Sequence, residues 1–377
     1  MLDKLKQYNF KQYNIPLLIV VLILSSIGVF LISKVQAADE SLVVRQILGL
    51  VGGLVIALVV SLIDYHFIAS FYIIMYIINL VLLILVKSSF GVTINYAQRW
   101  INLFGIQFQP SELTKIILIL FAAKVFTLAK AKINNFLVLT LITVSIAIPT
   151  FLILIQTNLS TSMVIMFIFV MMVFAAGLSW KIIVPIIVIG VPCVLGLFWY
   201  VQQDYQILLK DYQQERVLSY INPEEYAETM FQQDNSKIAI GSGQLIGKVF
   251  ASDNSTVRNY DDVPISESDF IFSVAGEEFG FIGGFVIISL FAVIIYICLM
   301  TAKKAPDYMG MLIAVGIASM FMFQVFVNIG VATSILPNTG IPLPFVSYGL
   351  SSFISGMLAI GLILNIGLQP MRTRIQQ

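Results

Sequence analysis

Asp269 and Glu277 lie in an acidic segment, residues 266–280, whose spacing could place two carboxylates on one helical face. They are eight residues apart, which is about 80° around an α-helix, whereas Glu278 would lie about 180° from Asp269. Because a hydroxyl or carboxylate can cap the beginning of a helix, Ser268 and Asp269 are also candidate caps. The spacing leaves open whether Asp269 is a plain cap or a functional acid.

A glycine-rich segment, residues 236–248, combines Ser242 with Lys237 and Lys248. Backbone amides in such a segment can turn toward an anion, and the lysines add positive charge. The segment is not a Walker A loop, because Ser242 stands where that pattern requires its first glycine. It predicts either a flexible, glycine-interrupted loop or a phosphate-binding turn.

Arg99 and the segment 108–115 supply a third set of charges. Glu112 and Lys115 are three residues apart, so they share one face of a helix that begins near residue 110. Charged groups at membrane depth pair with each other or face a water-filled cavity. Glu112 and Lys115 are therefore expected to form a structural ion pair or to line a cavity that touches the substrate.

The segment 336–349 contains three prolines and two glycines and cannot form a regular helix. Ser347 is its candidate polar group. Non-helical backbone at membrane depth is tolerated only where it is buried in protein or lines a cavity. An ordinary outer loop and a re-entrant wall of a binding site both fit this pattern.

The elements that position these residues must be transmembrane helices, because 59% of the 377 residues are hydrophobic and only 11% are charged. Soluble domains have roughly 45–50% apolar and about 25% charged residues. Apolar runs of about 20 residues, long enough to cross a bilayer, recur along the chain, and the alternating segments of an outer-membrane barrel are missing. The predicted spans are 15–33, 46–63, 67–86, 112–129, 136–155, 159–178, 182–201, 270–300, 309–335 and 351–369.

The sequence therefore predicts an all-α polytopic membrane protein, a single domain over residues 1–377, with about ten transmembrane helices. Residues 202–268 form a large extracytoplasmic loop between the seventh and eighth helices. Ten basic residues lie in the termini and the even-numbered connections, against four in the short odd-numbered ones, which places both termini in the cytoplasm. The first span lacks a cleavage pattern and is expected to remain as an anchor.

Composition also excludes several kinds of function. A net charge of +1, without a dense basic run, gives no reason to expect a nucleic-acid partner. His66 is the only histidine, and Cys193 and Cys298 lie inside apolar runs, so zinc chemistry and Cys–His catalysis are not expected. His66 lies in the short connection 64–66, which is expected to be a turn, and a structural or interfacial role is expected for it.

Together these segments resemble the SEDS family (shape, elongation, division and sporulation), the group of RodA, FtsW and SpoVE. Each motif alone has little specificity, but the combination is highly specific and covers nearly the whole chain in family order. The matching segments are 99–101, 108–112 with Lys115, 238–243 with 247–248, 269–272 with 276–278, and 328–330 with 339–345 and 347–349.

The resemblance implies a peptidoglycan glycosyltransferase of the cytoplasmic membrane, which polymerises lipid II on the outer leaflet together with a class B penicillin-binding protein. It marks Asp269, in the family's Asp-Phe-Ile-Phe segment, as the catalytic residue. The short termini favour a RodA-like role in cell elongation and shape, among other elongation-complex membrane proteins and membrane lipid. FtsW-like division and SpoVE-like sporulation are the alternatives.

In the implied reaction, Asp269 acts as general base for a sugar hydroxyl that attacks an anomeric carbon. Cations would offset the charge that develops on the leaving diphosphate, and a divalent metal, Mg or Mn, is an alternative source of that charge. The basic candidates, in no order, are Arg99, Arg216, Lys237 and Lys248.

The chain departs from the family pattern at three places. Asn158 replaces a frequent acid, residues 265–268 lack the histidine that often precedes the aspartate, and Leu350 replaces a frequent glycine. A lipid II flippase and a scaffold for a transpeptidase are alternative functions. A transporter places polar residues at mid-membrane in broken helices, often in repeated halves. Here the polar residues gather near the outer helix ends, which favours an enzyme at the outer face.

Overall fold

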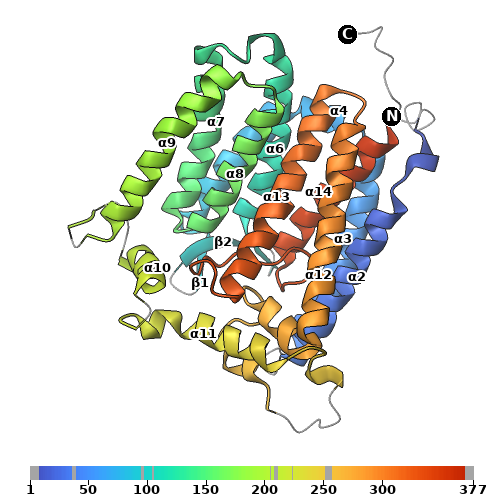
Figure 1. The fold of residues 1–377 in the computed structure, drawn as a ribbon. Helices are drawn as coiled ribbons and strands as arrows, with labels where there is room; N and C mark the ends of the chain where they lie inside the picture. Colours follow the sequence, from blue (N-terminus) through green and yellow to red (C-terminus); the bar gives the residue numbers. More distant parts are fainter. Residues whose placement is uncertain are drawn as a thin grey trace.

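The computed structural model of the protein describes residues 8–35, 40–94, 97–103, 106–203, 205–207, 211–222, 224–250 and 257–369. Each predicted span corresponds to a helix of one bundle (Figure 1). These helices are α2 (Ile15–Lys34), α3 (Glu40–Leu62), α5 (Tyr72–Val86), α6 (Pro110–Leu128), α7 (Phe136–Ile155), α8 (Leu159–Ala175), α9 (Trp180–Val201), α12 (Ile271–Lys303), α13 (Tyr308–Ala332) and α14 (Leu350–Leu368).

Within the described residues, seven of these helices are long and apolar enough to cross a bilayer. The helices α5 and α8 are apolar but shorter. The helix α6 has 19 residues and carries Glu112, Lys115 and Lys124. An all-helical, multi-pass membrane architecture is thereby confirmed.

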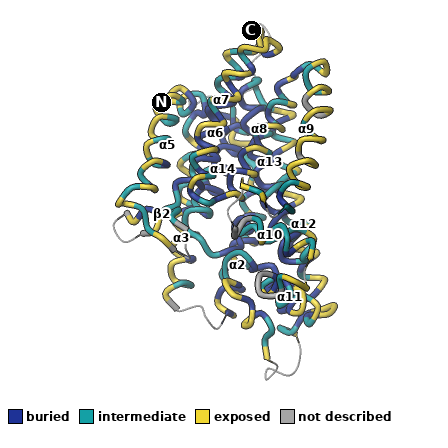
Figure 2. Tube along the Cα trace, turned by 90° about the vertical axis from the view of Figure 1, so that its left-hand side faces the viewer, coloured by how far each residue is buried: buried dark blue, intermediate teal, exposed yellow. Residues whose placement is uncertain are grey.

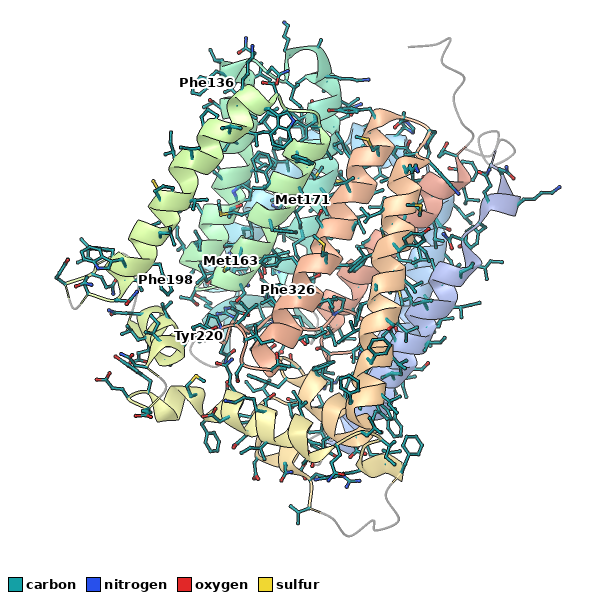
Figure 3. The ribbon with its side chains drawn as sticks, viewed as in Figure 1. Phe136, Met163, Met171, Phe198, Tyr220 and Phe326 are labelled. Carbon is teal, nitrogen blue, oxygen red and sulfur yellow. The ribbon has the colours of Figure 1, made fainter. Side chains whose placement is uncertain are left out.

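The centre of the bundle consists of α6, α13 and α14, whose residues are mostly buried. Exposed residues follow α5 and α9 at the two sides, with α13 and α14 between them (Figure 2). Apolar side chains such as Phe136, Phe198 and Phe326 cover the outside (Figure 3). An apolar exterior around a packed interior suits helices that face lipid.

A small antiparallel sheet lies between α5 and α6, where the sequence predicted only a connection. It has the order β1 (Gly91–Ile94), β2 (Ala97–Leu103), β3 (Ile106–Phe108). Val92 pairs with Trp100, Ile101 pairs with Phe108, and the register shifts between Val92 and Thr93. The sheet places Arg99 on β2 and leads directly into α6.

The loop predicted to be extracytoplasmic, residues 202–268 and called the outer loop below, contains two helices, α10 (Asp211–Ile221) and α11 (Ala227–Ser242). Two short 3-10 turns follow, η3 (Lys248–Phe250) and η4 (Asn259–Asp262). Both helices lie at the opposite end of the bundle from α4 (Tyr65–Ser70), and α11 packs against α12 (Figure 1). The loop is therefore a folded cover over one end of the bundle.

The helix α12 is broken at Gly280, whose φ of +66° and ψ of −165° are not helical. The turn that follows α11 fills this break: the amides of Phe281 and Ile282 donate to the carbonyls of Gln244 (2.9 Å) and Leu245 (3.1 Å). The predicted eighth span is thus a short helix, which begins two residues after Asp269, followed beyond Gly280 by a long helix.

At the other end of the bundle, His66 joins two elements and lies within α4, not in a bare turn. Its Nδ1 contacts Asp64 (2.7 Å), which caps α4, and its Nε2 contacts Asp307 (2.6 Å), which caps α13 (Tyr308–Ala332). Burial raises the pKa of Asp307, but hydrogen bonds from His66 and the amide of Gly310 outweigh it and hold the pKa below its usual value. These contacts agree with the structural role expected for His66.

Candidate active site at the start of α12

Asp269 is half-buried and lies two residues before the first residue of α12. The N-cap of α12 is Phe270, without a side-chain capping bond, so the prediction that Ser268 or Asp269 caps this helix is wrong. The hydroxyl of Ser268 instead donates to Oδ1 of Asp269 (3.2 Å). Asp269 therefore lies just before α12 without being its N-cap.

Asn328 of α13 holds the backbone of Asp269. Its Nδ2 donates to the carbonyl of Asp269 and to that of Ile341, both at 2.8 Å. The side chain is 1% exposed, and its Oδ1 has no hydrogen-bond partner among the described residues. A buried side-chain amide that lost these bonds would remain unsatisfied, which is costly. The two bonds therefore hold the backbone at Asp269 close to the backbone at Ile341, in the segment after α13.

The proline-rich segment 336–349 forms a wall beside Asp269. The hydroxyl of Ser347 donates to the carbonyl of Ser268 (2.6 Å), and the amide of Tyr348 donates to the carbonyl of Glu267 (2.8 Å). A Cβ placed on Gly340, whose φ is +71°, would lie 3.1 Å from Oδ2 of Asp269. Of the two interpretations of this segment, its contacts support the wall of a binding site.

The turn between α7 and α8 connects Arg99 with this wall. Nη2 of Arg99 donates to the carbonyl of Thr157 (2.5 Å), and Ser160 donates to the carbonyl of Thr339, next to Gly340. Asn158, which stands where the family often has an acid, caps α8: its Oδ1 accepts a hydrogen bond from the amide of Thr161 (3.2 Å). The sheet and the Asp269 wall are thus joined through one turn.

Glu112 and Lys115 form the expected pair on α6, with 2.8 Å between Oε2 and Nζ. Both side chains are buried, at 5% and 2% exposure. Lys115 also borders a small cavity lined mainly by apolar side chains, among them Ile146 and Ile165. This geometry supports the structural ion pair, since breaking a buried pair costs about 3–5 kcal/mol.

Glu277 and Glu278 are both fully buried and hold the end of the outer loop. Glu277 pairs with Lys248 and accepts the amides of Asn259 (2.9 Å) and Tyr260 (2.8 Å). Glu278 forms an ion pair with Nε of Arg258 (2.7 Å) and accepts a hydrogen bond from the hydroxyl of Tyr260 (2.8 Å). Glu277 therefore serves the loop and not the surroundings of Asp269, although the sequence placed the two on one face.

Burial, followed by the hydrogen bond to Glu278, raises the pKa of the Tyr260 phenol well above its usual value. Tyr260 is therefore a neutral hydroxyl donor to that carboxylate at physiological pH. This bond adds to the contacts by which Glu278 fastens the loop.

The glycine-rich segment 236–248 does not form an open phosphate-binding turn. Ser242 donates to the carbonyl of Ala239 (2.8 Å), and the amides of Gly243 and Gly247 donate to carbonyls of the same turn. A Cβ on Gly243 would lie 2.0 Å from the carbonyl oxygen of Gly276. The glycine therefore permits close packing of α11 on α12, which explains the motif without an anion.

The remaining basic candidates lie on the outer loop. Lys237 is half-exposed and pairs with Asp234 (2.8 Å). Arg216 lies in α10, but its side chain is outside the described residues. Neither observation links Lys237 or Arg216 to Asp269.

No cluster of three or more metal-ligating side chains occurs within the part of the chain that the structure describes. Asp269 supplies one carboxylate at the junction. Mg²⁺ is commonly held by one or two carboxylates together with the phosphates of a substrate. The residues present fit that shared mode of binding and not an all-protein cage.

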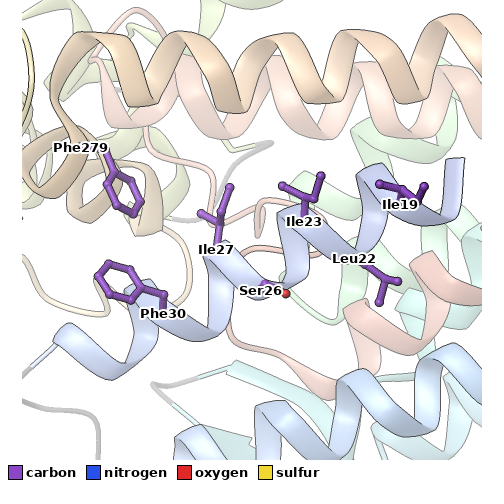
Figure 4. Close-up of a pocket in the computed structure, with 7 residues that line it drawn as sticks. All are labelled: Ile19, Leu22, Ile23, Ser26, Ile27, Phe30 and Phe279. Carbon is purple, nitrogen blue, oxygen red and sulfur yellow. The ribbon is translucent and has the colours of Figure 1, made fainter. Parts of the chain in front are cut away.

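An apolar groove lies on the face of the bundle that is suited to lipid. It is lined by one face of α2, from Ile19 to Phe30, and by Phe279 of α12 (Figure 4). Ser26 is its only polar lining residue. Such a lining suits hydrocarbon and offers no group for acid–base chemistry.

Sequence reasoning alone missed Asn328 and Gly340 as neighbours of Asp269. Both lie in segments that matched the resemblance, residues 328–330 and 339–345, so a signal for them was present. Ser347, which was a candidate, does reach the residue that precedes Asp269.

Comparison with known proteins places this arrangement in one family. The family model described as "Cell cycle protein", for FtsW, RodA and SpoVE, matches residues 10–371. Peptidoglycan glycosyltransferase MrdB of Escherichia coli is 32% identical over 353 residues, covering 93% of this chain and 92% of MrdB. Stage V sporulation protein E of Bacillus subtilis is 33% identical over 364 residues, covering 94% of this chain and 96% of the relative.

A probable peptidoglycan glycosyltransferase FtsW of Trichlorobacter lovleyi is 31% identical over 375 residues, covering 96% of this chain and 94% of the relative. Among solved structures, a chain of a peptidoglycan synthase complex aligns with a TM-score of 0.78 and 28% identity, covering 94% of this chain and 97% of that one. The rod shape determining protein RodA of Thermus thermophilus aligns with a TM-score of 0.67 and 26% identity, covering 94% and 96%. Because the family model matches residues 10–371, nearly the whole of this chain, the chain belongs to the FtsW, RodA and SpoVE family.

Proposed function

We propose that this peptidoglycan glycosyltransferase extends glycan strands from lipid II at the outer face of the cytoplasmic membrane, with Asp269 as general base. The observation that carries the proposal is the placement of Asp269. Its carboxylate lies at a loop-to-helix junction beside Gly340, and its backbone is held by Asn328. A base held by neighbouring segments keeps the geometry that proton transfer requires.

In the proposed step, a sugar hydroxyl attacks the anomeric carbon that carries undecaprenyl diphosphate. A new glycosidic C–O bond forms, the bond to the diphosphate oxygen breaks, and the electron pair leaves with the diphosphate. The hydroxyl proton passes to Asp269. Because attack comes from the face opposite the leaving group, the anomeric centre inverts and no covalent glycosyl-enzyme is needed.

The negative charge on the leaving diphosphate requires a cation. Arg99 is the candidate whose β-strand is joined to the wall of Asp269 through the turn at Thr157. Lys115 and Lys248 are already paired with Glu112 and Glu277. A divalent cation shared between Asp269 and the substrate diphosphate is the alternative, and Mg²⁺ or Mn²⁺ suits such oxygen ligands.

We further propose a role in cell elongation and shape, with a class B penicillin-binding protein as the partner and other elongation-complex membrane proteins nearby. The similarity to the rod shape determining protein RodA of Thermus thermophilus supports this choice. Relatives named for division and sporulation have an identity at least as high, so division or sporulation is the alternative role. Complementation of an elongation-deficient strain, compared with a division-deficient strain, tests it.

Polymerisation of labelled lipid II by the purified protein with its transpeptidase partner tests the enzyme. Asp269→Ala and Asp269→Asn should lower the rate by at least about 100-fold, the usual contribution of a general base. Asp262→Asn, which removes an exposed carboxylate of the same outer loop, should polymerise at the wild-type rate.

Retention of partner binding by the Asp269 variants separates loss of chemistry from loss of fold. Polymer formation by Asp269→Ala would refute the proposed base. A wild-type protein that moves lipid II across vesicles without making polymer would instead indicate a transporter, and one that only binds its partner a scaffold.

A further inference from the structure

The turn that follows α11, residues 243–247, exposes apolar side chains although it belongs to the outer loop. Leu245 is 61% exposed and Ile246 is 54% exposed. Gln244 is the only polar residue among the five. Single exposed apolar residues are common on water-soluble surfaces, so the position of this pair decides its meaning.

Backbone hydrogen bonds place this turn beside the beginning of the charge-free part of α12. The amide of Phe281 donates to the carbonyl of Gln244 (2.9 Å), and that of Ile282 to the carbonyl of Leu245 (3.1 Å). Phe281 is 70% exposed, and from Phe281 to Thr301 no residue is charged. Leu245 and Ile246 therefore lie at the depth of Phe281 and Ile282.

The length of α12 indicates where that depth lies in a bilayer. Phe281 and Lys303 are 22 residues apart. At a rise of about 1.5 Å per residue they are separated by about 33 Å, against about 30 Å for the hydrocarbon core. With Lys303 at one boundary of the hydrocarbon, Phe281 lies at the other.

The helix α2 gives a second, independent measure of depth. It ends at Lys34, and Phe30, one turn earlier, stacks on Phe279 with 5.5 Å between ring centroids (Figure 4). Phe279 is therefore about 6 Å inside the charged end of α2. Phe281 follows Phe279 toward the bilayer centre, so both measures place the level of Leu245 at or inside the hydrocarbon boundary.

A backbone at this depth must have its polar groups bonded within the protein, and the turn meets this requirement at three of its amides and three of its carbonyls. The amides of Gly243, Gln244 and Gly247 donate to Ile240, Gly241 and Gly243 at 2.8 to 3.3 Å. The carbonyls of Gln244 and Leu245 accept the two amides freed by the break at Gly280. The exposed part of the turn is then mainly the two apolar side chains.

We propose that residues 243–247 are a membrane-inserted tip, with Leu245 and Ile246 among the acyl chains of the outer leaflet. The outer loop is then held both by its packing on α12 and by contact with lipid. Because the tip fills the break at Gly280, lipid contact also steadies the outer part of α12 that begins after Asp269. A protein partner on the same two side chains is the competing occupant.

Depth-dependent fluorescence quenching tests the tip. Single cysteines at 245 and 246, in the full chain with Cys193→Ala and Cys298→Ala, are labelled with an environment-sensitive fluorophore. The protein is reconstituted without a partner in phosphatidylglycerol and phosphatidylethanolamine vesicles that contain doxyl-labelled lipids. Phe285→Cys, one turn deeper on the exposed face of α12, is the lipid-facing control, and Lys237→Cys on α11 is the water-facing control.

We expect the probes at 245 and 246 to be quenched by lipid nitroxides to nearly the extent of the probe at 285, and far more than the probe at 237. Quenching at both positions no greater than at 237 would overturn the proposal. Blue-shifted emission that is insensitive to lipid nitroxides would also overturn it and would indicate a protein-covered patch. The readout does not use polymerisation, so it stands apart from the role of Asp269.

Discussion

Asp269 owes its position to backbone atoms and small residues from distant parts of the chain. Gly340 contributes space: its Cα lies so close that a Cβ would be 3.1 Å from the Asp269 carboxylate. Its φ of +71° also favours glycine. A substitution here combines backbone strain with crowding of the proposed base, and the two effects can be separated.

We expect Gly340→Ala to lower the polymerisation rate per folded molecule by about 10- to 100-fold, because a displacement near 1 Å at a reacting group has such effects. Gly177→Ala is the matched control, since Gly177 has a φ of +83° and open space around its Cα. Both variants carry the left-handed strain of roughly 1–2 kcal/mol. Equal losses of rate and thermal stability in the two variants would show that only strain matters.

Asn328 is expected to act as a positioning residue through the backbone of Asp269. Asn328→Ala removes the bonds to the carbonyls of Asp269 and Ile341, which should destabilise the protein by about 1–3 kcal/mol and lower kcat more than it raises KM. The measurements are thermal unfolding in detergent and steady-state polymerisation.

Asn365 provides the comparison for Asn328, because it is also fully buried and accepts the amide of Tyr65 (2.9 Å) while donating to the carbonyl of Ser61 (2.7 Å). These contacts lie at the other end of the bundle, near α4. Asn365→Ala should lose similar stability and keep its kcat. A kcat loss of the same size in both variants would make the effect of Asn328 a general consequence of destabilisation.

The sequence pointed to Asp269 as the proposed base but did not predict its surroundings. The resemblance marked it, and the helical spacing then grouped it with Glu277, which the structure assigns to Lys248 and the loop amides. Spacing along one helix does not show which distant segment will lie on a given face. The Asp269 partners, Asn328 and Gly340, are 59 and 71 residues away.

At the scale of elements, the glycine-rich segment shows why one motif has two physical interpretations. An amide that approaches a phosphate and a backbone that approaches another backbone both require that Cβ be absent. The structure distinguishes Gly243, whose Cβ would lie 2.0 Å from the carbonyl oxygen of Gly276, from Gly241, which has nothing within 4 Å.

Gly243→Ala should therefore separate α11 from α12 and destabilise the outer loop, at a cost of about 1–3 kcal/mol for overpacking. Gly241→Ala, two residues earlier on α11, should be neutral or stabilising by about 0.5–1 kcal/mol, because alanine favours helix. Limited proteolysis of the outer loop measures the effect. Equal sensitivity of both variants would contradict the packing role of Gly243.

Long apolar helices were the predictable elements, because about 20 consecutive apolar residues have few alternatives in a bilayer. The sheet β1–β3 was missed because its strands have only 4, 7 and 3 residues. The helix α11 was missed because its polar residues, Gln233 and Ser236, turn inward and bond to carbonyls at the end of α13. A polar face that is buried gives no amphipathic signal.

At the scale of the whole molecule, the proposed chemistry requires that Asp269 and the outer loop lie outside the cell. The folded cover formed by α10 and α11 lies at one end of the bundle, and α4 lies at the other (Figure 1). Basic residues at the α4 end, among them Lys132 and Lys304, agree with a cytoplasmic location of that end. The proposed function of Asp269 therefore depends on the orientation of the bundle in the membrane.

Cysteine accessibility in intact cells measures this orientation. In a background with Cys193→Ala and Cys298→Ala, Lys237→Cys should react with a membrane-impermeant maleimide added outside, because Lys237 is exposed on α11. Lys132→Cys, also exposed but between α6 and α7, should react only after the membrane is opened. Both substitutions remove one surface charge, so their stability should match to within about 0.5 kcal/mol. The reverse labelling pattern would place Asp269 at the cytoplasmic face, where the proposed polymerisation on the outer leaflet could not occur.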